Sequence, residues 1–140
     1  MGKILCATRG GEASYRTQDA AIVLAKERGD TLLFLYVVDI SFLNKTAVPM
    51  VVDVGDEMGK MGNFLLTMAQ ERAQEQGVEA EAICRIGNTR EEIKAAVGEE
   101  GIALVVLGHP SGKRNVFAEE SLRAFAAEIE GETGATVVLV

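Results

Sequence analysis

The segment GHPSGKRN, residues 108–115, places two glycines, a hydroxyl, a histidine and two basic residues between an apolar run and a stretch of helical periodicity. A glycine-rich turn from a strand into a helix can bring backbone N–H groups close to phosphate oxygens. The first hypothesis is therefore a phosphate site. The segment does not fit a P-loop, which needs four residues between its glycines and Ser or Thr after the lysine. Here three residues separate Gly108 from Gly112, and Arg114 follows Lys113.

A second turn, RGGEAS at 9–14, also leads from an apolar run into a helical pattern. Arg9 beside two glycines at the start of a helix can bind a small anion. Pairing of Arg9 with a nearby carboxylate explains the residue equally well. The turn is similar to the SGGxDS turn of ATP pyrophosphatases but lacks its first serine and its aspartate, which leaves an adenylating enzyme as a distant alternative.

The residues that could act in catalysis or bind a metal lack partner residues at a suitable spacing in this sequence. His109 is the only histidine, and neighbouring Ser111 does not make a triad, which is defined by geometry rather than adjacency. Cys6 and Cys84 lie in apolar runs without metal-ligand spacing. The sequence predicts no catalytic residue and no metal site.

Composition narrows the class of protein. The chain has 140 residues, 48% of them hydrophobic, which is typical of one globular domain. The formal net charge of −7 disfavours binding to nucleic acid or to an anionic membrane. No apolar stretch approaches the length of a membrane span, and the N-terminal apolar run is too short for a signal peptide. We expect a soluble cytoplasmic protein.

Two hydrophobic periods alternate along the chain. Strand-like runs are followed by helical patterns in regular succession, the strands at 3–8, 31–38, 78–86, 102–108 and 135–140, and the helices at 12–28, 56–77, 88–100 and 118–129. This alternation predicts a parallel sheet with helices on both faces and a ligand site at the carboxyl ends of the strands.

Details within these elements predict how they pack. Run 78–86 alternates apolar and charged residues, as in an edge strand. The helix at 88–100 begins with a capping signal, either Asn88 with Glu91 or Thr89 with Glu92. The helix at 56–77 is expected to pack one stripe into the core, formed by Met58, Met61, Leu65 and Met68. The preceding segment, 39–56, is apolar and could form a lid, a short helix or a partner surface.

The ordered combination of KILCATRGGEAS, LLFLYVVD, GNTREEIKAAVGEEGIALVVLG and GATVVLV resembles the universal stress protein family over nearly the whole chain. The resemblance implies a Rossmann-like α/β fold with a five-stranded parallel sheet in the order 3-2-1-4-5. In that order the second strand separates Cys6 from Cys84 by about 9–10 Å, too far for a disulfide. Both cysteines are expected to be free thiols.

The resemblance also identifies nine positions that match the family's nucleotide site: Ala7, Arg9, Val37, Leu107, Gly108, Ser111, Gly112, Ser121 and Leu122. Nucleotide-binding members have Gly, two residues, Gly, nine residues, Gly and then Ser or Thr after the fourth strand. Only Gly108 matches, since Ser111, Ser121 and Leu122 occupy the other positions, although Gly112 matches after a slip by one. Arg9 stands where binders carry an acidic residue, and it cannot accept a hydrogen bond from ribose.

These departures predict a non-catalytic binding or association protein of the stress response that does not hold ATP tightly and needs no cofactor. The alternative is an adenine-nucleotide-binding member that holds ATP or AMP, with Mg²⁺ for a triphosphate, and hydrolyses it slowly or not at all. The final strand lacks charge and proline, which predicts a homodimer paired along it. The residues of that interface are Thr136, Val137, Val138, Leu139 and Val140.

Overall fold

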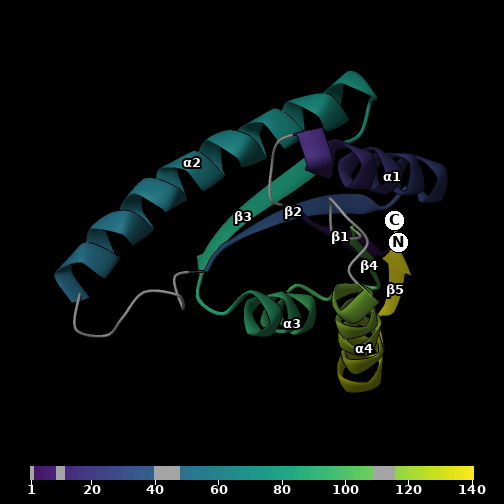
Figure 1. Ribbon diagram of the computed structural model, residues 1–140. Helices are drawn as coiled ribbons and strands as arrows, with labels where there is room; N and C mark the ends of the chain where they lie inside the picture. Colours follow the sequence, from purple (N-terminus) through teal and green to yellow (C-terminus); the bar gives the residue numbers. More distant parts are fainter. Residues whose placement is uncertain (1, 9–11, 40–47, 109–115) are drawn as a thin grey trace.

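The computed structural model describes residues 2–8, 12–39, 48–108 and 116–140 (Figure 1). Strands and helices alternate along these residues: β1 (Lys3–Ala7), α1 (Glu12–Arg28), β2 (Thr31–Val38), α2 (Val48–Glu75), β3 (Ala80–Ile86), α3 (Thr89–Glu99), β4 (Leu104–Leu107), α4 (Val116–Thr133) and β5 (Thr136–Leu139). None of the described helices is long and apolar enough to cross a membrane.

The five strands form one parallel sheet in the order β3-β2-β1-β4-β5. This is the order that the family resemblance implied, and it confirms the predicted α/β fold. β3 lies at one edge of the sheet, as its alternating sequence indicated. β5 lies at the other edge.

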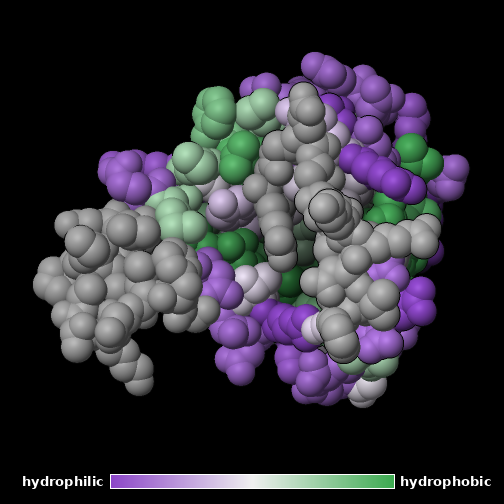
Figure 2. Space-filling model, viewed as in Figure 1, coloured by the Kyte–Doolittle hydropathy of each residue, from purple (hydrophilic) through white to green (hydrophobic). Residues whose placement is uncertain are grey.

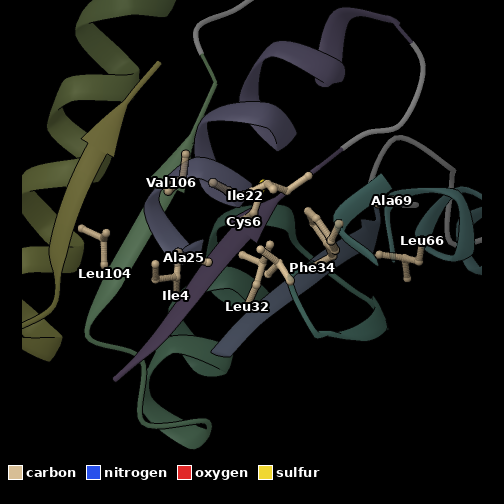
Figure 3. Packing of buried hydrophobic residues seen from close by; sticks show 13 residues of the cluster. Ile4, Cys6, Ile22, Ala25, Leu32, Phe34, Leu66, Ala69, Leu104 and Val106 are labelled. Carbon is tan, nitrogen blue, oxygen red and sulfur yellow. The ribbon is translucent and has the colours of Figure 1, made fainter. Parts of the chain in front are cut away.

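Helices cover both faces of the sheet, with α1 and α2 on one side and α3 and α4 on the other (Figure 1). Each face has its own buried hydrophobic cluster. β2 contributes alternate residues to the two clusters, Leu32 and Phe34 to one and Leu33 and Leu35 to the other, which explains why its sequence is apolar throughout. In the first cluster, Ile22 and Ala25 of α1 and Leu66 and Ala69 of α2 pack over the strands (Figure 3).

The helix ends follow the local sequence. Asn88 is the N-cap of α3, and its side-chain oxygen accepts a hydrogen bond from the backbone N–H of Glu91 at 3.1 Å. This is the first of the two capping signals that the sequence offered. Ile93, Ala96 and Val97 form the buried side of α3, as predicted. Gly29 and Gly77 follow α1 and α2 with positive φ angles of 67° and 78°, which glycine adopts without strain.

The face that α2 buries differs from the prediction. Met61 is 61% exposed and Phe64 is 66% exposed, whereas the buried positions are Leu66, Ala69 and Ala73. The predicted methionine stripe is therefore wrong by about one residue. The helix also begins at Val48, so the part of segment 39–56 from residue 48 onward is helical, which was one of its three open alternatives, and residues 40–47 lie outside the described residues. Figure 2 shows hydrophobic residues on the outer surface of α2.

The reason for this rotation is a close approach at Gly62. A Cβ atom added to Gly62 would lie 2.7 Å from a ring carbon of Tyr36 and 3.2 Å from the Cys84 sulfur. Only a glycine lets the α2 backbone pack this closely against β2 and β3. Small residues, not the long methionines, thus determine which side of α2 faces the sheet.

Cys6 and Cys84 are both free, as predicted. Cys6 lies on β1 at the centre of the sheet, and complete burial raises the pKa of its thiol to about 12. Cys84 lies on β3 and is partly exposed, and burial raises its pKa as well. β2 runs between the two strands that carry them.

Candidate functional site

A pocket of about 580 Å³ opens at the carboxyl ends of β1, β2 and β4. The sheet order reverses between β1 and β4, and this is the place where open parallel sheets bind ligands. The pocket is lined by Ala7, Thr8, Leu35, Tyr36, Val37, Asp39, Met58, Thr89, Arg90, Ile93, Leu107, Gly108, Leu122 and Phe125. Figure 2, viewed as in Figure 1, shows hydrophobic residues at the centre of this face, between the two layers of helices.

Most of the lining is apolar. Strand ends contribute Ala7, Leu35, Val37 and Leu107, and the helices contribute further side chains, which are Met58, Ile93, Leu122 and Phe125. Such a lining can bury a planar, weakly polar body, while the few polar side chains determine how that body is oriented.

The base of the pocket depends on tight packing between β4 and α1. A Cβ atom added to Gly108 would lie 2.3 Å from the Thr17 hydroxyl oxygen, so the position requires glycine for packing alone. The Gln18 amide donates a hydrogen bond to the Thr8 hydroxyl at 2.9 Å, and the Thr8 N–H donates to the carbonyl of Leu35 at 2.9 Å. These contacts hold the end of β1 between its neighbours.

Asp39, directly after β2, connects the pocket to the first turn of α3. Its carboxylate accepts hydrogen bonds from the backbone N–H of Thr89 at 3.1 Å and from the Thr89 hydroxyl at 2.9 Å. An anionic side chain is favoured at a helix N-terminus, where backbone N–H groups lack helical partners. The carboxylate therefore holds α3 in place beside the strand ends.

Arg90 is the cationic residue among the described residues that line the pocket. Its guanidinium donates a hydrogen bond to the Ser121 hydroxyl and lies over the ring of Phe125, 5.1 Å from the ring centroid. Both contacts join α3 to α4 along one wall. In the described part of the chain no carboxylate lies within ion-pair distance of Arg90.

The structure brings together five of the residues that the family resemblance identified, namely Ala7, Val37, Leu107, Gly108 and Leu122. Ser121 does not line the pocket but contacts it through Arg90. Arg9, Ser111 and Gly112 lie outside the described residues, together with His109. The anion site expected at Arg9 therefore stays a prediction.

Sequence reasoning missed several residues of the pocket. Asp39 could have been found, since it follows a predicted strand at its carboxyl end. Thr89 could also have been found, because it begins a helix with a recognised cap. Nothing in the local sequence marks Arg90, whose role depends on α4 lying beside it. Across the described residues no group of three or more His, Cys, Asp or Glu side chains could hold a metal ion.

Comparisons with known proteins agree with this fold. The model of the universal stress protein family matches residues 1–138. The universal stress protein YxiE of Bacillus subtilis is 32% identical over 116 residues, which cover 77% of this chain and 78% of that protein.

Two solved structures have the same fold. One is the universal stress protein UspA from Lactobacillus plantarum, with a TM-score of 0.82 at 18% identity, covering 99% of this chain and 97% of that one. The other is a universal stress protein in complex with cAMP, with a TM-score of 0.71 at 19% identity, covering 99% and 96% of the two chains. The family match and the B. subtilis relative show that this chain belongs to the universal stress protein family.

Proposed function

We propose that this universal stress protein is a non-catalytic binding protein whose pocket holds a small ligand with a planar body, and that it does not hold ATP tightly. The observation that supports this most directly is the lining of the pocket at Leu122. Nucleotide-binding members carry Ser or Thr at this position, and a leucine side chain has no donor for a phosphate oxygen. The pocket can surround a planar body but offers less to a triphosphate.

The polar residues of the pocket support binding rather than catalysis. The Asp39 carboxylate is held by the N–H and hydroxyl of Thr89, which is a structural use of this acid. Within the described lining there is no histidine or cysteine that could act as base or nucleophile. These features favour a protein that responds to a ligand over one that converts it.

An adenine-nucleotide-binding protein is the second candidate. It is favoured by the similar universal stress protein whose structure contains cAMP. Adenine is also a planar body of the kind that the apolar part of this pocket can surround.

Titration calorimetry of the full chain with adenosine, AMP and Mg-ATP tests both candidates. We expect measurable binding of the nucleoside and the monophosphate, and no higher affinity for Mg-ATP than for AMP. Leu122→Trp fills the pocket and should abolish binding, whereas Leu65→Trp on α2, outside the pocket, should leave it unchanged. Micromolar binding of Mg-ATP that exceeds that of AMP would contradict weak ATP binding, and the absence of binding by all three would contradict the pocket's role.

A further inference from the structure

Arg90 lines the pocket without a carboxylate partner, unlike six other basic residues in the described part of this acidic protein. Lys3, Arg28, Lys60, Arg72, Arg85 and Lys94 each lie within 4 Å of a carboxylate. Arg90 has no such partner in the described part of the chain, although the protein carries a net charge of −7. Its charge is therefore available to a ligand in the pocket.

The guanidinium is exposed but has two contacts on α4. The hydroxyl of Ser121 accepts one of its hydrogen bonds, and the ring of Phe125 supports its face. Stacking on an aromatic ring leaves the edge of the guanidinium available, and that edge carries the N–H donors. A positioned arginine of this kind loses little conformational entropy when it binds an oxyanion.

The pocket lining also contains one acidic residue among those described, Asp39. Its carboxylate accepts hydrogen bonds from the first turn of α3, where the helix dipole favours a negative charge. The described lining thus carries one anionic and one cationic side chain. Such a pocket suits a ligand with one compact anionic group better than a chain of phosphates.

We propose that Arg90 is the anion-binding residue of this pocket, and that the ligand joins a planar apolar body to a single compact oxyanion. The inference rests on the proposed function, because it assigns the polar end of the ligand whose planar end the apolar lining surrounds. A guanidinium binds a phosphate monoester and a carboxylate through the same paired N–H donors. We assign the binding of such an oxyanion to Arg90. Probes that carry either a phosphate or a carboxylate distinguish the two groups.

Calorimetry of the full chain with three probes tests the proposal. Adenosine supplies the planar body alone, AMP adds a phosphate monoester, and adenosine-5′-carboxylic acid adds a carboxylate. We expect the wild type to bind AMP or the carboxylic acid about 10- to 100-fold more tightly than adenosine, as for a hydrogen-bonded charged group. The probe with the larger gain identifies the oxyanion.

Arg90→Ala should remove this gain, so that AMP and the carboxylic acid bind this variant no more tightly than adenosine does. Arg90→Lys should restore part of it, since lysine keeps the charge but loses the paired donors and the stacking on Phe125. Arg123→Ala is the matched control, because Arg123 is exposed on α4 and does not line the pocket. Unfolding midpoints without ligand verify that each variant is folded.

The outcomes separate this proposal from the one on which it rests. Equal affinity of the wild type for all three probes, or unchanged AMP and carboxylic acid binding in Arg90→Ala, would overturn the role of Arg90 while the pocket keeps its function. No binding of any probe by the wild type would overturn the proposed function, and the role of Arg90 with it.

Discussion

The two edges of the sheet are built differently. β3 alternates apolar and charged residues, and its charges are paired, Glu81 with Lys3 and Arg85 with Glu92 and Glu99 of α3. α2 packs across β3, and the Gln70 amide donates a hydrogen bond to the backbone carbonyl of Ala80 at 3.0 Å. Charge, a covering helix and a bonded backbone group all make this edge unsuitable for pairing with another strand.

β5, at the opposite edge, has the sequence TVVL without a charged residue. Its ladder with β4 uses the N–H groups of Thr136 and Val140, which directs those of Val137 and Leu139 away from β4. A carboxylate oxygen of Glu130 accepts a hydrogen bond from the Val137 N–H at 3.2 Å. The edge is thus protected at one backbone group, which the sequence pattern did not indicate.

The protein thus protects the β3 edge strongly and the β5 edge weakly. We therefore propose that two copies pair along β5 about a two-fold axis, which closes the assembly at a dimer. The interface would comprise the residues identified from the sequence, Thr136, Val137, Val138, Leu139 and Val140. The predictions that follow test the weakly protected edge first and the strongly protected one afterwards.

The largest effect is expected from Leu139→Pro. Proline removes the N–H of Leu139, which points away from β4 and is available to a paired strand. The mass measured by light scattering at micromolar concentration should fall from two chains to one. Leu139→Ala, which loses the side chain but keeps the N–H, is the control and should remain a dimer. A wild type with the mass of a single chain would end the proposal.

At the protected edge, Gly62→Ala should loosen the cover that α2 provides. The added methyl group would overlap the Tyr36 ring, which costs more than the helix propensity gained, so we expect a net loss of about 1–2 kcal/mol. Urea denaturation measures it. Gly59→Ala lies in the same helix with no atom within 4 Å of the new Cβ, and it should gain about 0.5–1 kcal/mol. Equal effects of the two variants would show that α2 is not held by this contact.

The two cysteines report separately on the centre of the sheet and on its β3 edge. Burial raises the pKa of Cys6 to about 12, which leaves roughly one thiolate in ten thousand at pH 8. Burial raises the pKa of Cys84 too, but its side chain is partly exposed beneath α2. At pH 8, Ellman's reagent should modify Cys84 slowly and Cys6 at least tenfold more slowly. In denaturant both thiols are exposed, and both should react rapidly.

Cys84→Ser should remove the faster of the two phases, because the remaining thiol lies at the centre of the sheet. Raising the pH increases the thiolate fraction of both groups, so both rates should rise between pH 7 and pH 9. Rapid modification of both cysteines in the native protein would contradict the burial of β1 and the cover over β3.

Much of the fold could be predicted because its signals are local. Apolar strands alternating with helical periods require a parallel sheet covered on both faces, and the charged alternation of β3 marks an edge. The Asn88 cap and the glycines that end α1 and α2 are equally local, since each satisfies backbone groups of its own helix. Part of the site could also be predicted, because the strand ends that line it, among them Ala7 and Val37, follow from the fold.

Features that depend on contacts between distant segments were not visible in the sequence. In the sequence of α2, the methionines form a clearer hydrophobic stripe than the residues that are actually buried. Gly62 nevertheless determines the buried face, because a residue without a side chain allows the helix to approach β2 and β3 closely. Arg90 and Ser121 lie 31 positions apart and meet only because α3 and α4 pack side by side on one face of the sheet. Local patterns predict most of the strands and helices, and their alternation predicts a ligand site at the carboxyl ends of the strands. Which side chains surround that site depends on how the helices pack against one another and against the sheet, and no local pattern carries that information.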